Sequence, residues 1–267
     1  MNTWWEIWLT GLGAMSALAT VLWLVSLIKN DVSIVDSIWS LFFLVGVVAY
    51  SMAGPGSERA WLTIGLVALW AVRLSGYITW RNWGEGEDYR YVAMREKNGP
   101  AFRYTSLVRV FLLQAVIAWV VSLPLLGVAL STAPLGPVDA LGVAMFSIGL
   151  FFEAVGDWQL SRFKANPDNK GKVMDRGLWR YTRHPNYFGD FTLWWGLYLL
   201  ALGAGAWWAF PGPLIMSFFL LKVSGVAMLE KDIGERRPKY ADYIERTNAF
   251  FPGPPKPTAS STAVSET

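Results

Sequence analysis

Residues 177–190, GLWRYTRHPNYFGD, contain the side chains of this sequence that are best suited to bind a charged molecule. They include the only histidine of the chain, His184, which is followed by Pro185. Proline disfavours helix at the preceding residue and suits the first turn of a new helix. The free N–H groups of that turn, with Arg180 and Arg183 beside them, would form a binding site for an anion.

His184 itself has several interpretations. It could be a neutral hydrogen-bonding group, a charged partner of a phosphate or a general acid. It could also be a structural residue that satisfies backbone groups at the start of the helix. The sequence alone leaves these roles open.

The preceding segment, residues 164–176 (KANPDNKGKVMDR), combines basic side chains with residues typical of tight turns. Its basic residues could donate charge-assisted hydrogen bonds to phosphate groups. The excess of positive charge in cytoplasmic connections of membrane proteins would account for several of them without any ligand. The density of cations directly before the expected helix start favours phosphate binding. The basic residues are Lys164, Lys170, Lys172 and Arg176.

Several ionisable residues lie within apolar segments, where they are costly and usually face a polar cavity or a partner. Glu153 and Asp157 are four residues apart, and therefore lie on one face of a helix. Asp157 could accept a hydrogen bond from a ribose hydroxyl or an amide of a cofactor, or it could form an ion pair with Arg162 at a solvated helix end.

Asp36, Arg73 and Tyr77 are the corresponding candidates in the N-terminal half. Arg73 needs a partner or an aqueous cavity, and Asp36 is a possible partner. Tyr77 could donate a proton or polarise a carbonyl, although tyrosines near an interface are often anchors. We expect these residues to form the polar lining of a substrate pocket.

The composition indicates a membrane protein. Of the 267 residues, 54% are hydrophobic and 16% are charged, whereas soluble domains average about 25% charged residues. The absence of cysteine excludes disulfides and thiolate chemistry, and a single histidine makes a metal centre improbable. A net charge of +3 is too small to indicate a nucleic-acid partner.

Apolar segments of about 20 residues are long enough to span a bilayer. Because open sheet edges are not tolerated in lipid, we predict an all-α integral membrane protein with about seven spans. It forms one domain over residues 1–251, with a substrate half (1–135) and a cofactor half (136–251). Residues 252–267 are expected to be disordered. The predicted spans are residues 4–28, 32–53, 60–80, 104–130, 137–160, 187–205 and 208–229.

Basic residues are concentrated in the connections after the third and fifth predicted spans and in the C-terminal part. The alternate connections contain almost none. By the positive-inside rule, we expect the N-terminus outside and the C-terminus in the cytoplasm. We expect the protein to lie in the cell membrane. Residues 177–190 then face the cytoplasm.

Three stretches carry a resemblance to a known family: NKGK at 169–172, GLWRYTRHPNYFGD at 177–190 and LEKDIGERRPKYADYIERTNAFFP at 229–252. Together they resemble the steroid 5-alpha-reductase-like membrane family, in particular its DUF1295 branch. RHPNYFGD at 183–190 is also similar to the equivalent stretch of the delta-14 sterol reductases.

The resemblance implies a cytoplasmic NADPH site and hydride transfer to a carbon–carbon double bond of a hydrophobic enone. The Glu and Tyr pair with which animal steroid 5-alpha-reductases hold their ketone has no match here, so the polar substrate contacts are expected from Asp36, Arg73 and Tyr77. The residues expected to bind the cofactor are Asp157, Lys164, Asn169, Lys172, Arg176, Trp179, Tyr181, Arg183, His184, Asn186, Tyr187 and Asp190.

Two other functional classes remain open, a methyltransferase and a non-catalytic scaffold or transporter. Isoprenylcysteine carboxyl methyltransferases carry a similar RHP-x-Y-x-G stretch and bind S-adenosylmethionine, and Glu230 could replace the glutamate of their last helix. S-adenosylmethionine has no phosphate, so the cations at 170–176 favour the reductase, as do Asn186 and Asp190. A non-catalytic scaffold or transporter could use the intramembrane charges to line a pathway, but no repeat symmetry is visible.

Overall fold

The computed structural model describes residues 2–223 and 240–256, and all regular secondary structure in those residues is helical. This confirms the predicted all-α class. The chain forms two compact units. Unit 1 comprises residues 1–139 and 197–212, and unit 2 comprises residues 140–196 and 213–267, so some helices contribute to both units.

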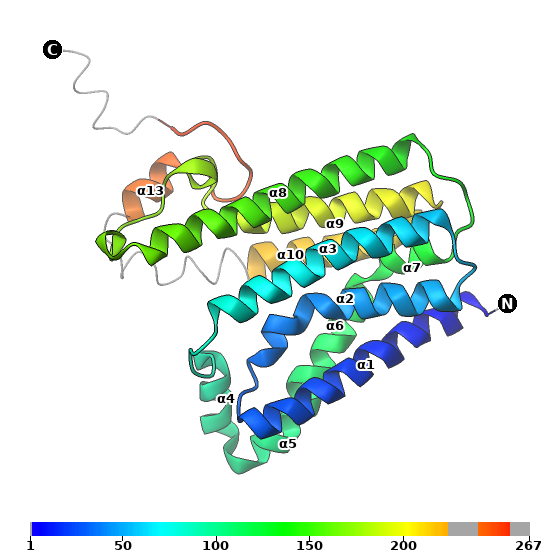
Figure 1. Ribbon diagram of the computed structural model, residues 1–267, viewed down its shortest axis with the longest axis horizontal. Helices are drawn as coiled ribbons and strands as arrows, with labels where there is room; N and C mark the ends of the chain where they lie inside the picture. Colours follow the sequence, from blue (N-terminus) through cyan, green and yellow to red (C-terminus); the bar gives the residue numbers. More distant parts are fainter. Residues whose placement is uncertain (1, 224–239, 257–267) are drawn as a thin grey trace. The chain divides into compact units, whose positions relative to one another are not determined.

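Unit 1 begins with three long helices, α1 (Trp4–Lys29), α2 (Ile34–Ala53) and α3 (Glu58–Arg81) (Figure 1). The backbone N–H of Thr3 donates to the Glu6 carboxylate (2.6 Å), and Ser57 accepts from the backbone of Ala60 (3.2 Å). These bonds satisfy groups that a helix start leaves without partners.

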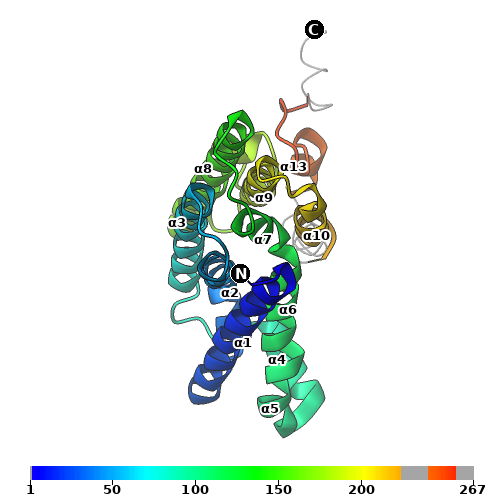
Figure 2. The same cartoon turned by 90° about the vertical axis from the view of Figure 1, so that its right-hand side faces the viewer.

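Helix α1 lies beside both α2 and α6 (Leu113–Val121) (Figure 2). The indole of Trp119 stacks on that of Trp8, with centroids 3.9 Å apart, and donates to the backbone oxygen of Trp8 (2.9 Å). Gly11 allows the ring of Tyr50 to approach, because an added Cβ would lie 2.0 Å from it. Small and aromatic residues therefore bring these helices close together.

The segment between α3 and α6 differs in detail from its prediction. Residues 84–98, between two predicted spans, contain α4 (Tyr89–Asn98), and helical structure continues to Val121. The predicted span at 104–130 breaks at Ser122, after which Pro124 stands in the first turn of α7 (Leu123–Ala129). The intervening elements are η1 (Gly99–Ala101), α5 (Phe102–Ser106) and the π-helix η2 (Leu107–Leu112).

Unit 2 is built around most of α8 (Pro137–Ala165) and the first part of α9 (Pro185–Gly203). Their backbones approach closely at glycines: a Cβ added to Gly189 would lie 2.4 Å from the backbone nitrogen of Glu153. The remaining elements are η3 (Pro167–Asn169), η4 (Gly177–Arg180), α10 (Pro211–Phe218), the π-helix η6 (Phe219–Val223) and α13 (Tyr240–Arg246), with η5 (Trp207–Ala209) in unit 1.

Five helical segments among the described residues are long and apolar enough to cross a membrane, which confirms an integral membrane protein. Helix α9, with its polar first turns, is not one of them, and the predicted span at 208–229 extends beyond the described residues. Seven spans therefore stay a prediction. The five segments are Trp4–Lys29, Ile34–Ala53, Glu58–Arg81, Tyr89–Val121 and Pro137–Ala165.

Candidate functional site

The start of α9 is held in place by Thr182, which is fully buried. Its hydroxyl donates to the backbone oxygen of Phe250 (2.7 Å) and accepts from the backbone N–H of His184 (3.2 Å). Helix α9 begins at Pro185, which confirms the helix start predicted from the sequence. His184 is 3% exposed, and its ring stacks on that of Tyr187. The only histidine of the chain is thus part of a fixed local structure.

Arg183 has a structural contact that the sequence did not indicate. Its Nη1 atom donates to the backbone oxygens of Ile244 (3.1 Å) and Thr247 (2.6 Å), at the C-terminal end of α13. Helix ends leave carbonyls without partners, and a cation there also complements the helix dipole. Because more than 60 residues separate the partners, no local pattern reveals this contact.

Asp157 and Asn186 form a polar pair that joins α8 to α9. The amide Nδ2 of Asn186 donates to Oδ1 of Asp157 (3.2 Å), and its Oδ1 accepts from the backbone N–H of Tyr187 (3.1 Å). Asp157 is 5% exposed, whereas Asn186 is partly exposed. The close approach at Gly156 makes the pair possible, since a Cβ there would lie 3.3 Å from the Asn186 nitrogen. Asp190, also buried, follows one turn later on α9.

Trp179 anchors the segment that leads to this pair. Its indole donates to the backbone oxygen of Gly156 (3.0 Å), and the hydroxyl of Tyr243 donates to the Trp179 carbonyl. Burial raises the pKa of Tyr243, so the hydroxyl keeps its proton for this bond. Gly177 precedes it in the left-handed region (φ 58°), where glycine is favoured. Trp179 therefore fixes the segment against α8.

The other residues predicted to bind the cofactor lie mostly at the surface of unit 2. Asn169 donates from its side chain to the backbone oxygen of Phe163 (2.9 Å), which shapes the turn after α8. Arg246 of α13 forms an ion pair with Asp175 in the same connection. The exposed residues are Lys164, Lys172, Arg176 and Tyr181. A connection with exposed cations thus leads directly into the segment that ends at Asn186.

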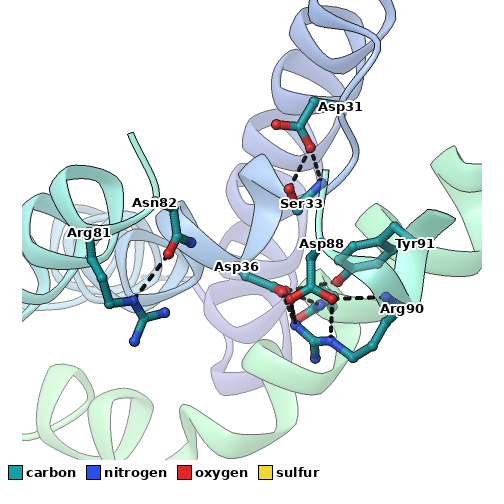
Figure 3. Close-up of polar contacts among 9 residues, drawn as sticks. Asp31, Ser33, Asp36, Arg81, Asn82, Asp88, Arg90 and Tyr91 are labelled. Atoms are coloured by element: carbon teal, nitrogen blue, oxygen red, sulfur yellow. Dashed lines mark hydrogen bonds and ion pairs between the residues drawn. The ribbon is translucent and has the colours of Figure 1, made fainter. Parts of the chain in front are cut away.

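In unit 1, Asp36 is the centre of a hydrogen-bonded cluster (Figure 3). Its carboxylate accepts from Arg90 (2.7 Å) and from the hydroxyl of Tyr91 (2.8 Å). Arg90 also binds Asp88 (2.9 Å), and this hydrogen bond holds the pKa of Asp88 below its usual value. Arg90 and Tyr91 are not among the site residues expected from the sequence. The sequence feature that could have pointed to them is Asp88, a residue type that is favoured at the start of a helix. It is the N-cap of α4 and accepts a hydrogen bond from the backbone N–H of Arg90 (2.9 Å).

Arg73 and Tyr77 lie together on α3, as four-residue spacing on a helix requires. The Arg73 guanidinium carbon is 5.7 Å from the centre of the Tyr77 ring, and that of Arg81 is 5.9 Å from it. Both distances are within the range of cation–π contacts. The phenol ring of Tyr77 therefore has two cations nearby.

Within residues 2–223 and 240–256, no group of three or more His, Cys, Asp or Glu side chains could hold a metal ion. The apolar helices, which are long enough to cross a membrane, and the Asp157–Asn186 hydrogen bond define an all-helical integral membrane protein with a polar pair at the start of α9. The chain belongs to the DUF1295 family, described as proteins of unknown function, which matches residues 22–247.

Two relatives have similar sequences. "Uncharacterized protein C594.04c" of Schizosaccharomyces pombe is 26% identical over 273 residues, which cover 88% of this chain and 76% of the relative. "Probable O-methyltransferase ustE" of Ustilaginoidea virens is 38% identical over 92 residues, or 34% of this chain and 31% of the relative. No solved structure matches the chain significantly.

Proposed function

We propose that this protein is a membrane-embedded, NADPH-dependent reductase of a carbon–carbon double bond in a hydrophobic enone. The observation that carries the proposal is the arrangement of unit 2, where a connection with exposed cations leads to the partly buried Asp157–Asn186 pair. The first feature suits phosphates, and the second suits ribose hydroxyls or a carboxamide.

The residues of unit 2 fit NADPH by their donor and acceptor chemistry. Lys164, Lys172 and Arg176 are exposed cations that would hold its phosphate groups. Asp157 is an acceptor for hydroxyl or amide protons, and the partly exposed Asn186 offers both a donor and an acceptor. When bound, NADPH supplies the hydride; the residues of the chain bind it and orient it.

Asp36, Arg73 and Tyr77 are the proposed substrate-facing residues. The Tyr77 hydroxyl is suited to donate a hydrogen bond to a carbonyl oxygen. The guanidinium of Arg73, beside the Tyr77 ring, would stabilise negative charge that develops on that oxygen. Asp36, bound by Arg90 and Tyr91, would orient the polar end of the substrate. An apolar substrate would reach these residues from the lipid.

The second candidate function is methyl transfer from S-adenosylmethionine. It is favoured by the 92-residue similarity to a relative that is named a probable O-methyltransferase. Glu230, which could serve as the acidic residue of such a site, lies outside the described residues. The cations of unit 2 favour NADPH, because S-adenosylmethionine carries no phosphate.

Ligand-dependent thermal unfolding of the detergent-purified protein separates the two candidates. NADPH, NADP, NADH and S-adenosylmethionine are compared, because a ligand that binds only the folded state raises its apparent stability. We expect NADPH and NADP to raise the unfolding temperature more than NADH does, with no effect of S-adenosylmethionine. Stabilisation by S-adenosylmethionine alone would establish methyl transfer instead.

A double variant, Lys172→Gln with Arg176→Gln, tests the phosphate assignment. Loss of two charge-assisted contacts should weaken NADPH binding by about tenfold or more. The matched control is Lys97→Gln with Arg103→Gln, which removes two exposed cations of unit 1. Equal NADPH affinities of the two double variants would contradict the assignment. Consumption of NADPH with hydrophobic enones then tests the reaction.

A further inference from the structure

A cavity of about 550 Å³ lies in unit 1 where three long apolar helices end or begin. Lys29 is the last residue of α1, Ile34 is the first of α2 and Arg81 is the last of α3, and all three line the cavity. Its volume is within the range of small-molecule sites. Because the ends of membrane-spanning helices lie near the lipid headgroups, a ligand here would have access to lipid.

One part of the cavity lining is apolar. It consists of Leu22 and Val25 from α1 and Ile34 and Ile38 from α2, which belong to segments that are long and apolar enough to cross a membrane. Trp83, which also lines the cavity, is 79% exposed. Exposed tryptophans are typical of the membrane interface. This part of the lining suits the hydrocarbon and glycerol region of a lipid.

Two cations form the positive part of the lining, Lys29 and Arg81. Nε of Arg81 donates to the side-chain oxygen of Asn82 (3.1 Å). Within the described part of the chain, the two terminal nitrogens of Arg81 and the Lys29 ammonium have no hydrogen-bond or ion-pair partner. These groups are therefore available to bind a phosphate.

Carboxylates form the negative part of the lining. One carboxylate oxygen of Asp31 accepts from both the backbone N–H (2.8 Å) and the hydroxyl of Ser33, which leaves its other oxygen for a ligand. The Glu85 side chain has no partner among residues 2–223 and 240–256. Asp88 also lines the cavity, but Arg90 forms an ion pair with it (2.9 Å; Figure 3). Asp31 and Glu85 are thus the acceptors that remain for a cation.

We propose that this cavity binds the headgroup of phosphatidylethanolamine from the surrounding bilayer. Lys29 and Arg81 would bind the phosphate, and Asp31 and Glu85 would accept hydrogen bonds from the primary ammonium. The four groups sum to zero charge, which matches a zwitterion better than an anionic lipid. A choline headgroup has no N–H to donate to the carboxylates. The site uses residues of unit 1 alone and is independent of the proposed cofactor site.

Native mass spectrometry of the full-length protein in detergent tests this site. Equal amounts of phosphatidylethanolamine, phosphatidylcholine and phosphatidylglycerol are added, and the lipid retained by the protein is measured. We expect the ethanolamine lipid to be retained preferentially. Lys29→Gln with Arg81→Gln should lower its affinity by about tenfold, whereas Lys97→Gln, an exposed cation elsewhere in unit 1, should not change it.

Glu85→Gln tests the ammonium contact. Loss of this carboxylate should reduce the preference for the ethanolamine lipid over phosphatidylglycerol. The proposal is overturned if the three lipids are retained equally, if phosphatidylglycerol is preferred by the unmodified protein, or if the cation variants bind normally. Displacement of the lipid by equimolar free phosphoethanolamine would instead assign the cavity to a soluble ligand. Thermal stabilisation of the same variants by NADPH reports separately on the proposed function.

Discussion

Two polar pairs, one in each unit, differ in how far they are buried. Arg59 of unit 1 is 1% exposed and binds Asp139 through two nitrogens (2.7 and 2.8 Å). The same guanidinium donates to the backbone oxygens of Ala133 (2.9 Å) and Pro134 (2.8 Å). In unit 2, Asp157 and Asn186 are joined by a bond of 3.2 Å. Asn186 is partly exposed and follows a connection with exposed cations along the chain.

This difference indicates which polar residues of an apolar helix are structural. The Arg59 guanidinium is buried and bound to partners within unit 1, so it connects the start of α3 to residues 133–139. Its role is to hold the fold. At Asn186 the exposure allows a ligand to compete for donors and acceptors.

The largest expected effect is that of Arg59→Met. Removing one partner leaves the Asp139 charge buried and uncompensated, which should cost about 3–5 kcal/mol of stability. Thermal unfolding in detergent measures the loss. Arg59→Met with Asp139→Leu should recover much of it, because no lone charge remains. A loss below about 1 kcal/mol, typical of surface pairs, would show that the pair is not structural.

Gly189→Ala tests the helix contact that brings Asp157 and Asn186 together. The added methyl would lie 2.4 Å from the backbone nitrogen of Glu153 and 2.5 Å from the Gly149 oxygen. Overpacking of this kind costs about 1–3 kcal/mol, and NADPH binding should weaken as the helices separate. Gly65→Ala on α3, where nothing lies within 4 Å of the new methyl, is the control and should not destabilise. Equal unfolding temperatures of the two variants would contradict the close contact.

Asn186→Ala should affect ligand binding more than folding. Loss of its hydrogen bonds should weaken NADPH binding by about tenfold, while unfolding without ligand changes by about 1 kcal/mol. Titration of purified protein with NADPH measures the first effect. Asn98→Ala, which removes a side-chain hydrogen bond to Met94 in unit 1, is the control. Unchanged NADPH affinity of Asn186→Ala would remove the site assignment.

The smallest expected effect is the pH dependence of Asp88. Its pKa is lowered in the folded state, chiefly by the hydrogen bond from Arg90, so its contribution exists above the unfolded pKa and is lost as the pH falls. Asp88 is 33% exposed, and the contribution should be below about 1 kcal/mol. Asp88→Asn should be slightly less stable at pH 7. The difference should shrink as the pH falls below about 4 and vanish once the pH is below the lowered folded-state pKa. A difference that grows in acid would contradict this sign.

Local patterns predicted the features that depend on neighbouring residues. The start of α9 at Pro185 was predictable because proline restricts the residue before it. The contact between Arg73 and Tyr77 follows from their four-residue spacing. By contrast, the cap that Arg183 provides for α13 and the bonds from Arg90 and Tyr91 to Asp36 join residues more than 50 positions apart. Spacing along the chain carries no information about such pairs.

The sequence by itself determined that this protein is surrounded by lipid and that its fold class is all-helical. Its hydrophobic composition requires lipid, and lipid requires helices that satisfy their own backbone groups. It also marked residues 177–190 as chemically unusual. Only the tertiary structure decided which polar residues are engaged in holding the helices and which are exposed. That choice depends on which helix faces meet, and these are fixed by packing between segments distant in the chain.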